Sequence, residues 1–274
     1  MGKKALKQFN ETVKFLKKQY KETPTVGIVL GSGLGNFVNE ITIEKEVAYD
    51  DIPNFPLSTV EGHKGRLIFG MLSGKKVVAM AGRFHFYEGY PAHDVVFPIR
   101  IMKLLGVETL LLSNAAGAVN PDYKVGDIMI IKDHVSFFTP NPLIGKNIAD
   151  FGPRFPDMSE PYKKHLIEKA KAIAAAHNFD VKEGVYVAVT GPTFETRAEY
   201  QFIHILGADV VGMSTVQECI VANHAGMEVF AMSVVTDVGI REEANTITHE
   251  EVLEAAGHAE PKLATIFKEL VAAI

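Results

Sequence analysis

The sequence predicts a single-domain α/β protein, and three observations carry this prediction. Apolar segments with the length of buried strands alternate with helix-like segments along 274 residues, and the 47% hydrophobic content is ample for one large core. Several of the apolar segments end in glycine or in polar side chains, as strands do where an open α/β sheet binds a ligand. No repeat, low-complexity tract or Ser-rich linker divides the chain, so we expect one domain over residues 1–274.

The N-terminal half begins with a predicted amphipathic helix over residues 1–22. Its apolar residues recur at alternating steps of three and four: Leu6, Phe9, Val13, Leu16 and Tyr20. A β-rich apolar run over residues 25–30 then ends in a glycine-rich turn at 31–35. Residues 66–71 and 76–81 are predicted to form a hairpin through the turn at 72–75.

The elements that follow include one ambiguous helix and one long loop. Residues 94–105 have the pattern of a helix with Asp94 as N-cap, although Pro98 lies in its first turn. Residues 133–158 are punctuated by Pro and Gly, and a loop of that length inside a compact domain is usually functional. The other strands are predicted at 108–113, 127–132, 184–190, 209–212 and 228–236, and the other helices at 161–177, 199–206, 216–225 and 249–273.

Composition points to a small-molecule partner. The net charge is −5 and no basic block exceeds short Lys pairs, so a nucleic-acid footprint is missing. No apolar run approaches the ~20 residues that span a bilayer, and we expect no membrane association. The single cysteine, Cys219, cannot form an intramolecular disulfide, which suits a reducing cytoplasm. The sequence contains neither the spacings of common metal sites nor a G-x-S-x-G nucleophile motif.

The richest polar segment is Gly-Arg-Phe-His-Phe-Tyr-Glu-Gly-Tyr at residues 82–90, directly after a predicted strand. Arg83 and His85 alternate with Phe84 and Phe86, so an extended backbone points both polar groups to one side. A guanidinium fork beside an imidazole suits a phosphate. The alternative is that both residues pair with Glu88 and other carboxylates at the surface.

Two further loops offer phosphate and ring contacts. The sequence Gly-Ser-Gly-Leu-Gly at 31–35 can cradle a phosphate with backbone N–H groups and a hydroxyl, and a plain tight turn is the equal alternative. In the segment at 191–196, Phe194 can cover a planar ligand while Glu195 accepts hydrogen bonds from ring N–H groups. The alternative there is a helix start with Thr193 as N-cap.

Three positions near predicted helix starts stay open between capping and ligand binding. Gly-Met-Ser-Thr-Val-Gln-Glu at 212–218 has a Ser or Thr cap followed by Glu218, and a helix N-terminus also attracts anions. Asp237 ends a strand and is either a cap or a ligand contact. Thr248 and Glu251 fit a capping box around His249.

Taken together, eight segments resemble the trimeric purine nucleoside phosphorylases, of the purine nucleoside and methylthioadenosine phosphorylase group, in order and spacing. They are Gly-Ser-Gly-Leu-Gly at 31–35, Glu-Gly-His at 61–63, the 82–90 segment, Asn-Ala-Ala-Gly at 114–117, Pro-Arg-Phe-Pro-Asp-Met-Ser at 153–159, Gly-Pro-Thr-Phe-Glu-Thr at 191–196, Gly-Met-Ser-Thr-Val at 212–216 and His-Glu-Glu-Val-Leu at 249–253. The resemblance covers nearly the whole chain.

This resemblance implies a mixed, partly barrel-like central sheet flanked by helices, a homotrimer, and phosphorolysis of purine nucleosides to the free base and ribose 1-phosphate in purine salvage. It implies no cofactor, because inorganic phosphate is a substrate. The implied phosphate site is Ser32, His63, Arg83, His85, Ala116 and Ser214. The implied ribose contacts are Tyr87, Met213 and His249, and the base contacts are Phe194, Glu195 and Asp237. His85, Glu195 and Asp237 are the implied catalytic residues, and Phe155 is implied to enter the neighbouring subunit's site.

Two residues depart from the family pattern. Asp237 stands where enzymes for 6-oxopurines usually have Asn, and Gln217 replaces the usual Pro. An ionised Asp accepts from a 6-amino group and repels a 6-oxo group, whereas a protonated Asp can donate. Asp237 therefore favours adenosine, whereas Glu195 suits an N1–H that adenine lacks and His249 suits a polar 5′-hydroxyl. On these two residues we expect activity on inosine and guanosine, with adenosine as an open extension. The alternatives are a phosphorylase that prefers methylthioadenosine or adenosine, and a non-catalytic nucleoside-binding relative.

Overall fold

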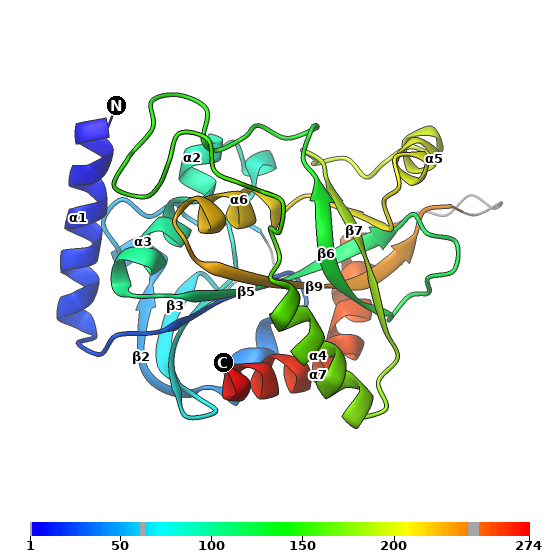
Figure 1. Cartoon of the computed structure of the whole chain (residues 1–274), viewed down its shortest axis with the longest axis horizontal. Helices are drawn as coiled ribbons and strands as arrows, with labels where there is room; N and C mark the ends of the chain where they lie inside the picture. The colour runs from blue at the N-terminus through cyan, green and yellow to red at the C-terminus, as the bar shows by residue number, and fades with distance from the viewer. Residues whose placement is uncertain (1, 61–63, 241–246) are drawn as a thin grey trace.

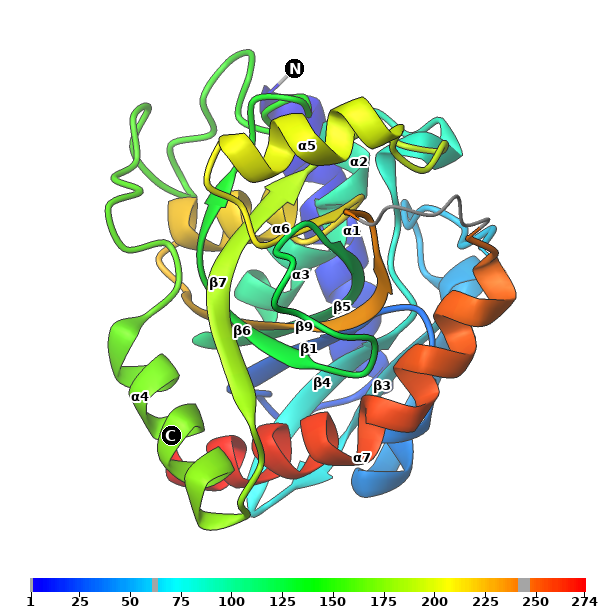
Figure 2. The ribbon, with the colours of Figure 1, turned by 90° about the vertical axis from the view of Figure 1, so that its right-hand side faces the viewer.

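The computed structural model describes residues 2–60, 64–240 and 247–274, and it shows one α/β domain built on a mixed sheet. The nine strands of the described residues are ordered β2-β3-β4-β1-β5-β8-β7-β6-β9, and β9 also pairs with β5. That additional pairing closes β5, β8, β7, β6 and β9 into a barrel, and the other four strands extend the sheet from β5. The expected mixed, partly barrel-like sheet is therefore confirmed, with helices around it (Figures 1 and 2).

The strands are β1 (Val26–Leu30), β2 (Thr42–Ala48), β3 (Arg66–Leu72), β4 (Lys75–Ala81), β5 (Thr109–Ala118), β6 (Ile128–Val135), β7 (Val181–Ala188), β8 (Val210–Gly212) and β9 (Glu228–Val238). The α-helices are α1 (Gly2–Gln19), α2 (Ala92–Val95), α3 (Phe97–Leu105), α4 (Lys164–Ala176), α5 (Arg197–Ile205), α6 (Val216–His224) and α7 (His249–Ala273). Short 3-10 helices occupy η1 (Gly35–Glu40), η2 (Tyr49–Asp51) and η3 (Phe86–Glu88). None of the helices in the described ranges is long and apolar enough to cross a membrane.

Strands β5 and β9 form the centre of the molecule, because each is covered on both faces. They run parallel from Thr109↔Glu228 to Ala118↔Val238, and nearly every residue in both is buried. Such strands appear in the sequence as continuous apolar runs rather than alternating patterns. Helix α7 runs beneath the sheet and is bent along its length, as Figure 2 shows, and Pro261 lies inside it. Proline cannot donate the helical hydrogen bond at that position and kinks the helix.

Two local predictions were wrong, and one strand was missed. Strand β2 was not predicted, because it is an edge strand whose charged residues, among them Glu44 and Lys45, leave no apolar run. Asp94 does not cap a long helix: it lies in the single turn α2, and α3 begins separately with Pro98 in its first turn, where proline is tolerated. Strand β5 does not stop at residue 113 but continues through Ala118, supported by its pairing with β8 and β9.

Candidate active site

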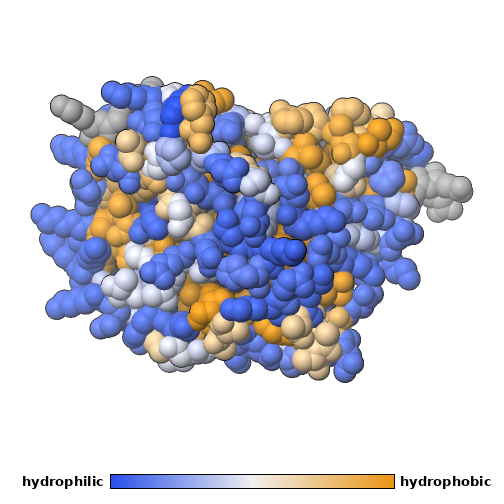
Figure 3. Space-filling view, viewed as in Figure 1, coloured by the Kyte–Doolittle hydropathy of each residue, from blue (hydrophilic) through white to orange (hydrophobic). Residues whose placement is uncertain are grey.

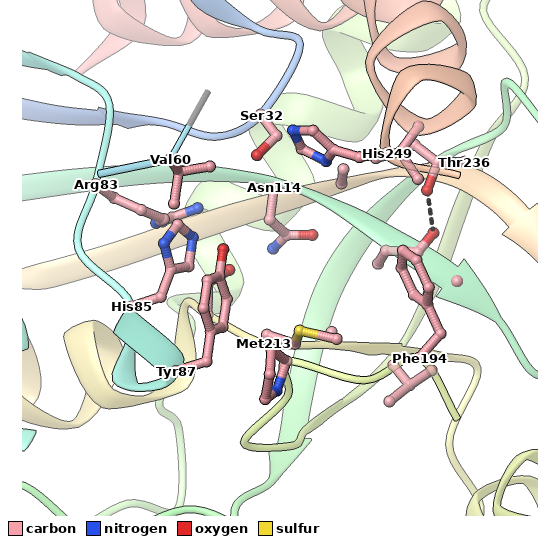
Figure 4. Close-up of a pocket in the computed structure, with 18 of the residues that line it drawn as sticks. Ser32, Val60, Arg83, His85, Tyr87, Asn114, Phe194, Met213, Thr236 and His249 are labelled. Carbon is pink, nitrogen blue, oxygen red and sulfur yellow. Dashed lines mark hydrogen bonds between the residues drawn. The ribbon is translucent and has the colours of Figure 1, made fainter. Parts of the chain in front are cut away.

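A cavity of about 530 Å³ lies where β1, β4, β5, β8 and β9 end, and helix α7 closes one side (Figure 4). Eleven of the residues predicted for the site line it: Ser32, Arg83, His85, Tyr87, Ala116, Phe194, Glu195, Met213, Ser214, Asp237 and His249. Phe155 does not: it is 86% exposed and lines a separate cavity of about 380 Å³. His63 lies outside the described residues.

Arg83 is held rigidly at the inner end of this cavity. Its side chain is 1% exposed, and Nε and Nη2 donate to the two carboxylate oxygens of Glu218 at 3.1 and 2.6 Å. Nη1 donates to the carbonyl oxygen of Ser113 on β5. Glu218, on α6, is equally buried at 3% exposed. Arg83 is thus paired with a carboxylate, as the alternative reading allowed, but the pair is buried and its guanidinium still lines the cavity.

His85 is oriented by Glu88 one turn further along. Its Nδ1 lies 2.9 Å from Glu88 Oε1, and its backbone N–H donates to the same oxygen at 2.7 Å. Burial lowers the pKa of His85 below its ordinary value, and the Glu88 contact only partly opposes this. Glu88 has its pKa lowered to about 2: burial raises it, but hydrogen bonds from His85 and Thr59 outweigh that effect. The ring of Tyr87 stacks on His85 at 4.7 Å between centroids. Through these contacts Glu88 fixes the orientation of the His85 ring.

The Ser32 loop is fixed against helix α7. Gly33 has φ +74°, and a Cβ there would come within 2.5 Å of the Ala256 Cβ and 2.9 Å of the Leu253 carbonyl oxygen. Glu260 of α7 accepts a hydrogen bond from Phe37 N–H at 2.8 Å, just after the loop. Glycine is therefore required at position 33, both by the backbone conformation and by the lack of space for a Cβ. Helix α7, which carries His249, thus also fixes the position of the loop that carries Ser32.

The segment before α6 is strained rather than capped. Thr215 has φ +70° although it is β-branched, and its side chain makes no N-cap hydrogen bond. It instead accepts from Asn114 Nδ2 at 2.8 Å and lies 3.1 Å from Ser214 Oγ. Of the two alternatives left open for this segment, side-chain capping by Thr215 is not observed, and Glu218 pairs with Arg83 instead. Strain of this kind persists where surrounding contacts enforce it, most often at functional sites.

The opposite end of the cavity carries two carboxylates and an aromatic ring. Burial raises the pKa of Glu195 above its ordinary value, with Asp237 adding to the rise and a hydrogen bond from Tyr200 opposing it. Asp237 is 7% exposed, and its Oδ1 accepts from Thr236 Oγ1 at 3.1 Å, the bond dashed in Figure 4. Phe194, 42% exposed, also lines the cavity. Thr196, not Thr193, caps α5, forming a capping box with Glu199.

His249 is presented by the first turn of α7. Thr248 caps the helix, accepting from Glu251 N–H at 3.2 Å, while Glu251 accepts from Thr248 N–H at 3.1 Å. The expected capping box is therefore present, and it directs His249 into the cavity rather than competing with binding. The Nε2 atom of His249 is buried, and among the described residues nothing hydrogen-bonds to it.

Several residues of the cavity were not predicted as site residues from the sequence. Asn114, Thr236 and Val60 line it, and Glu218 supports it from behind. Asn114 belongs to a motif that the sequence does single out, and its polar side chain in an apolar strand was the available signal. Glu218 gave no such signal, because it reads as an ordinary first-turn acid of a helix. In the part of the chain that the structure describes, no cluster of His, Cys, Asp and Glu could hold a metal ion.

Comparisons with known proteins agree over nearly the full length. Residues 25–272 match the family model of the phosphorylase superfamily. Purine nucleoside phosphorylase 1 of Bacillus subtilis (strain 168) is 50% identical over 258 residues, which cover 94% of this chain and 95% of that protein. The purine nucleoside phosphorylase of Bos taurus is 47% identical over 273 residues, covering 97% and 94%. The Schistosoma mansoni enzyme in complex with adenosine superimposes with a TM-score of 0.92 at 41% identity, covering 98% of this chain and 97% of that one.

Proposed function

The chain belongs to the phosphorylase superfamily and, within it, to the purine nucleoside phosphorylases, and from this membership we propose which residue of the cavity does what. The reaction is phosphorolysis: inorganic phosphate is a substrate, and no cofactor takes part. We assign phosphate to Ser32, Arg83, His85, the backbone of Ala116 and Ser214, with His63 as a further contact. We assign ribose to Tyr87, Met213 and His249, and the purine to Phe194, Glu195 and Asp237.

One observation carries these assignments: the two ends of a single cavity differ in chemistry. Hydroxyls, a guanidinium and an imidazole gather at the end formed by the 31–35 loop, the 82–88 segment and the start of α6. A ring and two carboxylates gather at the end formed by the 191–196 loop and β9. Donors suit a phosphate, whereas carboxylates beside an aromatic face suit a planar base with N–H groups. The space between the two ends of the cavity is left for the ribose.

The contacts of His85 determine the position of one proton at the phosphate end of the cavity. Glu88 is ionised and accepts from Nδ1–H of His85, so Nε2 is the nitrogen that faces the cavity. Because burial lowers the pKa of His85, that nitrogen carries no proton of its own near neutral pH. Monohydrogen phosphate brings one proton, and we place it between a phosphate oxygen and His85 Nε2. His85 thus recognises the protonated oxygen and leaves the others to Arg83 and the hydroxyls.

The reaction then needs no protein nucleophile. A phosphate oxygen attacks C1′, the C1′–N9 bond breaks, and its electron pair moves into the purine, which takes up a proton at N7. Positive charge on the ribose during this step is stabilised by the adjacent phosphate, as in other oxocarbenium chemistry. We assign this proton to the carboxylic acid of Asp237, which lies at the base end beside Thr236 and is left as a carboxylate after the transfer. The products are the free base and ribose 1-phosphate.

The base range follows from the two carboxylates. Ionised Glu195 accepts from N1–H, which hypoxanthine and guanine have and adenine lacks. Asp237 accepts from a 6-amino group only when ionised, and it then has no proton to give to N7, whereas the protonated form serves the 6-oxopurines. We therefore propose inosine and guanosine as the main substrates, with slower turnover of adenosine. The Schistosoma relatives solved with adenosine and with hypoxanthine give precedent for both kinds of base.

Steady-state phosphorolysis of inosine, guanosine, adenosine and methylthioadenosine tests this range. The wild type is expected to prefer inosine and guanosine, and Asp237→Asn is expected to lower the adenosine-to-inosine ratio of kcat/KM at least about tenfold, since the amide presents a donor to the 6-amino group. A wide preference for methylthioadenosine contradicts the proposal. Phosphate-dependent base release that is unchanged in His85→Ala or Glu195→Ala contradicts the residue assignments.

We further propose a homotrimer, and the exposed apolar side chains support it. Orange side chains gather over α5 at the upper right of Figure 3. Those of α5 and the loop after β6 include Phe137, Phe138, Phe202, Ile205 and Leu206, which are between 38% and 88% exposed. An exposed apolar surface of this kind marks an association site. Phe155, exposed on its own loop, is then free to enter the cavity of a neighbouring subunit beside Phe194.

We place the enzyme in the cytoplasm, in purine salvage, where the buried thiol of Cys219 stays reduced.

A further inference from the structure

Asn114 places a buried hydrogen-bond acceptor inside the cavity, and none of the assignments above uses it. The residue lies on β5 and is 1% exposed, yet it lines the cavity. Its Oδ1 atom is buried, and no group among the described residues hydrogen-bonds to it. Leaving such an acceptor without a donor is unfavourable. A side chain kept at that cost is expected to meet a donor on the substrate.

The orientation of this amide is set by its neighbours. Nδ2 donates to Thr215 Oγ1 at 2.8 Å, and Thr215 Oγ1 lies 3.1 Å from Ser214 Oγ. Thr215 itself is held at φ +70°. The main chain of Asn114 is packed so closely against Gly31 that a Cβ there would lie 2.8 Å from the Asn114 Cα. Because the nitrogen is committed to Thr215, the oxygen is the atom that remains for the ligand.

The position of the amide selects its partner. In Figure 4 Asn114 lies between the His85 and Tyr87 side chains on one side and the His249 and Thr236 side chains on the other. That is the middle of the cavity, between its phosphate end and its base end. An amide oxygen only accepts, so it repels unprotonated phosphate oxygens, and the one phosphate proton is already directed at His85. The hydroxyls of the ribose diol are the donors left in this part of the cavity.

We propose that Asn114 is a ribose-recognition residue whose Oδ1 accepts a hydrogen bond from one hydroxyl of the ribose diol, so that it contributes to discrimination between ribonucleosides and deoxyribonucleosides. The inference rests on the proposed function, because it takes the sugar to lie between the two ends of the cavity. The same amide, through Thr215, orients Ser214 toward phosphate. One side chain therefore links recognition of the sugar to the arrangement of the phosphate site.

The test is a cycle that removes the acceptor from the enzyme and the hydroxyl from the substrate. The phosphate-dependent kcat/KM of wild type and Asn114→Ala is measured with inosine, 2′-deoxyinosine and 3′-deoxyinosine. We expect the variant to lose about 10- to 100-fold with inosine and less than about threefold with the deoxynucleoside that lacks the contacted hydroxyl. Losses of equal size with all three substrates overturn the proposal, as does a change confined to the KM for phosphate.

Asn114→Asp serves as the matched variant. It keeps an oxygen acceptor in the same place, and Thr215 can donate to it, so the ratio between inosine and the deoxynucleosides is expected to stay within about threefold of wild type while phosphate binds more weakly. Loss of that ratio in Asn114→Asp contradicts the proposal and remains measurable if Asn114→Ala folds poorly. Failure of the proposed function is distinguishable, because the wild type itself would then release no base in the presence of phosphate.

Discussion

Arg83 and Glu218 form a buried, bidentate ion pair, although 135 residues separate them in the chain. The Glu218 carboxylate accepts hydrogen bonds from Nε and Nη2 of Arg83, and the Ser113 carbonyl oxygen accepts one from Nη1. A buried pair of this kind contributes little net stability compared with apolar residues, but loss of one partner is costly. Its consequence here is orientation, because the guanidinium that we assign to phosphate has its plane fixed before the substrate binds.

Removal of Glu218 should therefore damage phosphate use and stability together. For Glu218→Ala we expect the KM for phosphate to rise at least about tenfold, and the Tm to fall by roughly 10 °C, from ~3–5 kcal/mol lost at a buried pair. The exposed Arg66–Glu46 pair is the matched control: Glu46→Ala should shift Tm by no more than about 3 °C and leave the kinetics unchanged. Equal effects of the two variants would show that the buried pair positions nothing.

The pKa of Glu195 predicts the acid limb of the pH profile. Burial raises this pKa above 4.5, and only the ionised form accepts from N1–H of a 6-oxopurine. As pH falls through the raised pKa, kcat/KM for inosine should fall, with a midpoint above 4.5. Glu195→Gln should lower activity and abolish this limb. A raised carboxyl pKa also destabilises the folded state at neutral pH, so the Gln variant should melt no lower than wild type at pH 7. A limb that persists in Glu195→Gln assigns it to another group.

Gly33 offers a test of how helix α7 positions the phosphate loop. Gly33→Ala should be strongly destabilising and should raise the KM for phosphate, because the new Cβ meets Ala256 and the Leu253 carbonyl oxygen. Gly74 has a similar φ, +81° against +74°, but nothing lies within 4 Å of its Cβ position. Gly74→Ala should therefore cost only the backbone strain of about 1–2 kcal/mol and leave the kinetics intact. Similar thermal and kinetic losses in both variants would exclude a specific packing role for Gly33.

Subunit mixing tests the proposed contribution of Phe155. Phe155→Ala and Glu195→Ala are each expected to lose most activity, in a neighbour's site and in the subunit's own site respectively. Co-expression should give mixed trimers in which some sites combine an intact Glu195 with an intact Phe155, and activity should recover above the sum of the separate variants. Light scattering on the purified protein gives the oligomeric state. Recovery no greater than that sum, or a monomer that is fully active, contradicts the shared site.

Local patterns in the sequence predicted much of the fold. The hairpin of β3 and β4 and helix α7 were predicted because their turn, cap and apolar spacing lie within the segment itself. Closure of the barrel was expected only from the family resemblance. Strand β2 was missed because an edge strand needs no apolar run. The end of β5 was missed because the sequence Ala-Ala-Gly is typical of a turn, and only its pairing with β8 and β9 makes it a strand.

In the candidate site, too, some relationships were predictable from the local sequence and others were not. Arg83, His85 and Glu88 lie close together in the chain, so their relation was predictable from spacing. Glu218 and Asn114 act through contacts that exist only after folding, with Arg83 and Thr215 respectively. Thr215 reads as an N-cap, yet its backbone is held at φ +70° by the packing around it. Partners distant in sequence and strained backbone are set by tertiary structure, and no local pattern encodes them.

The most direct test of the central claim follows inosine and phosphate together. Purified enzyme with inosine is monitored by ³¹P NMR for the sugar phosphate and by absorbance for hypoxanthine, with and without inorganic phosphate. We predict that ribose 1-phosphate and hypoxanthine appear mole for mole, and that neither appears when phosphate is omitted. Release of hypoxanthine with free ribose, at a rate independent of phosphate, would contradict the account.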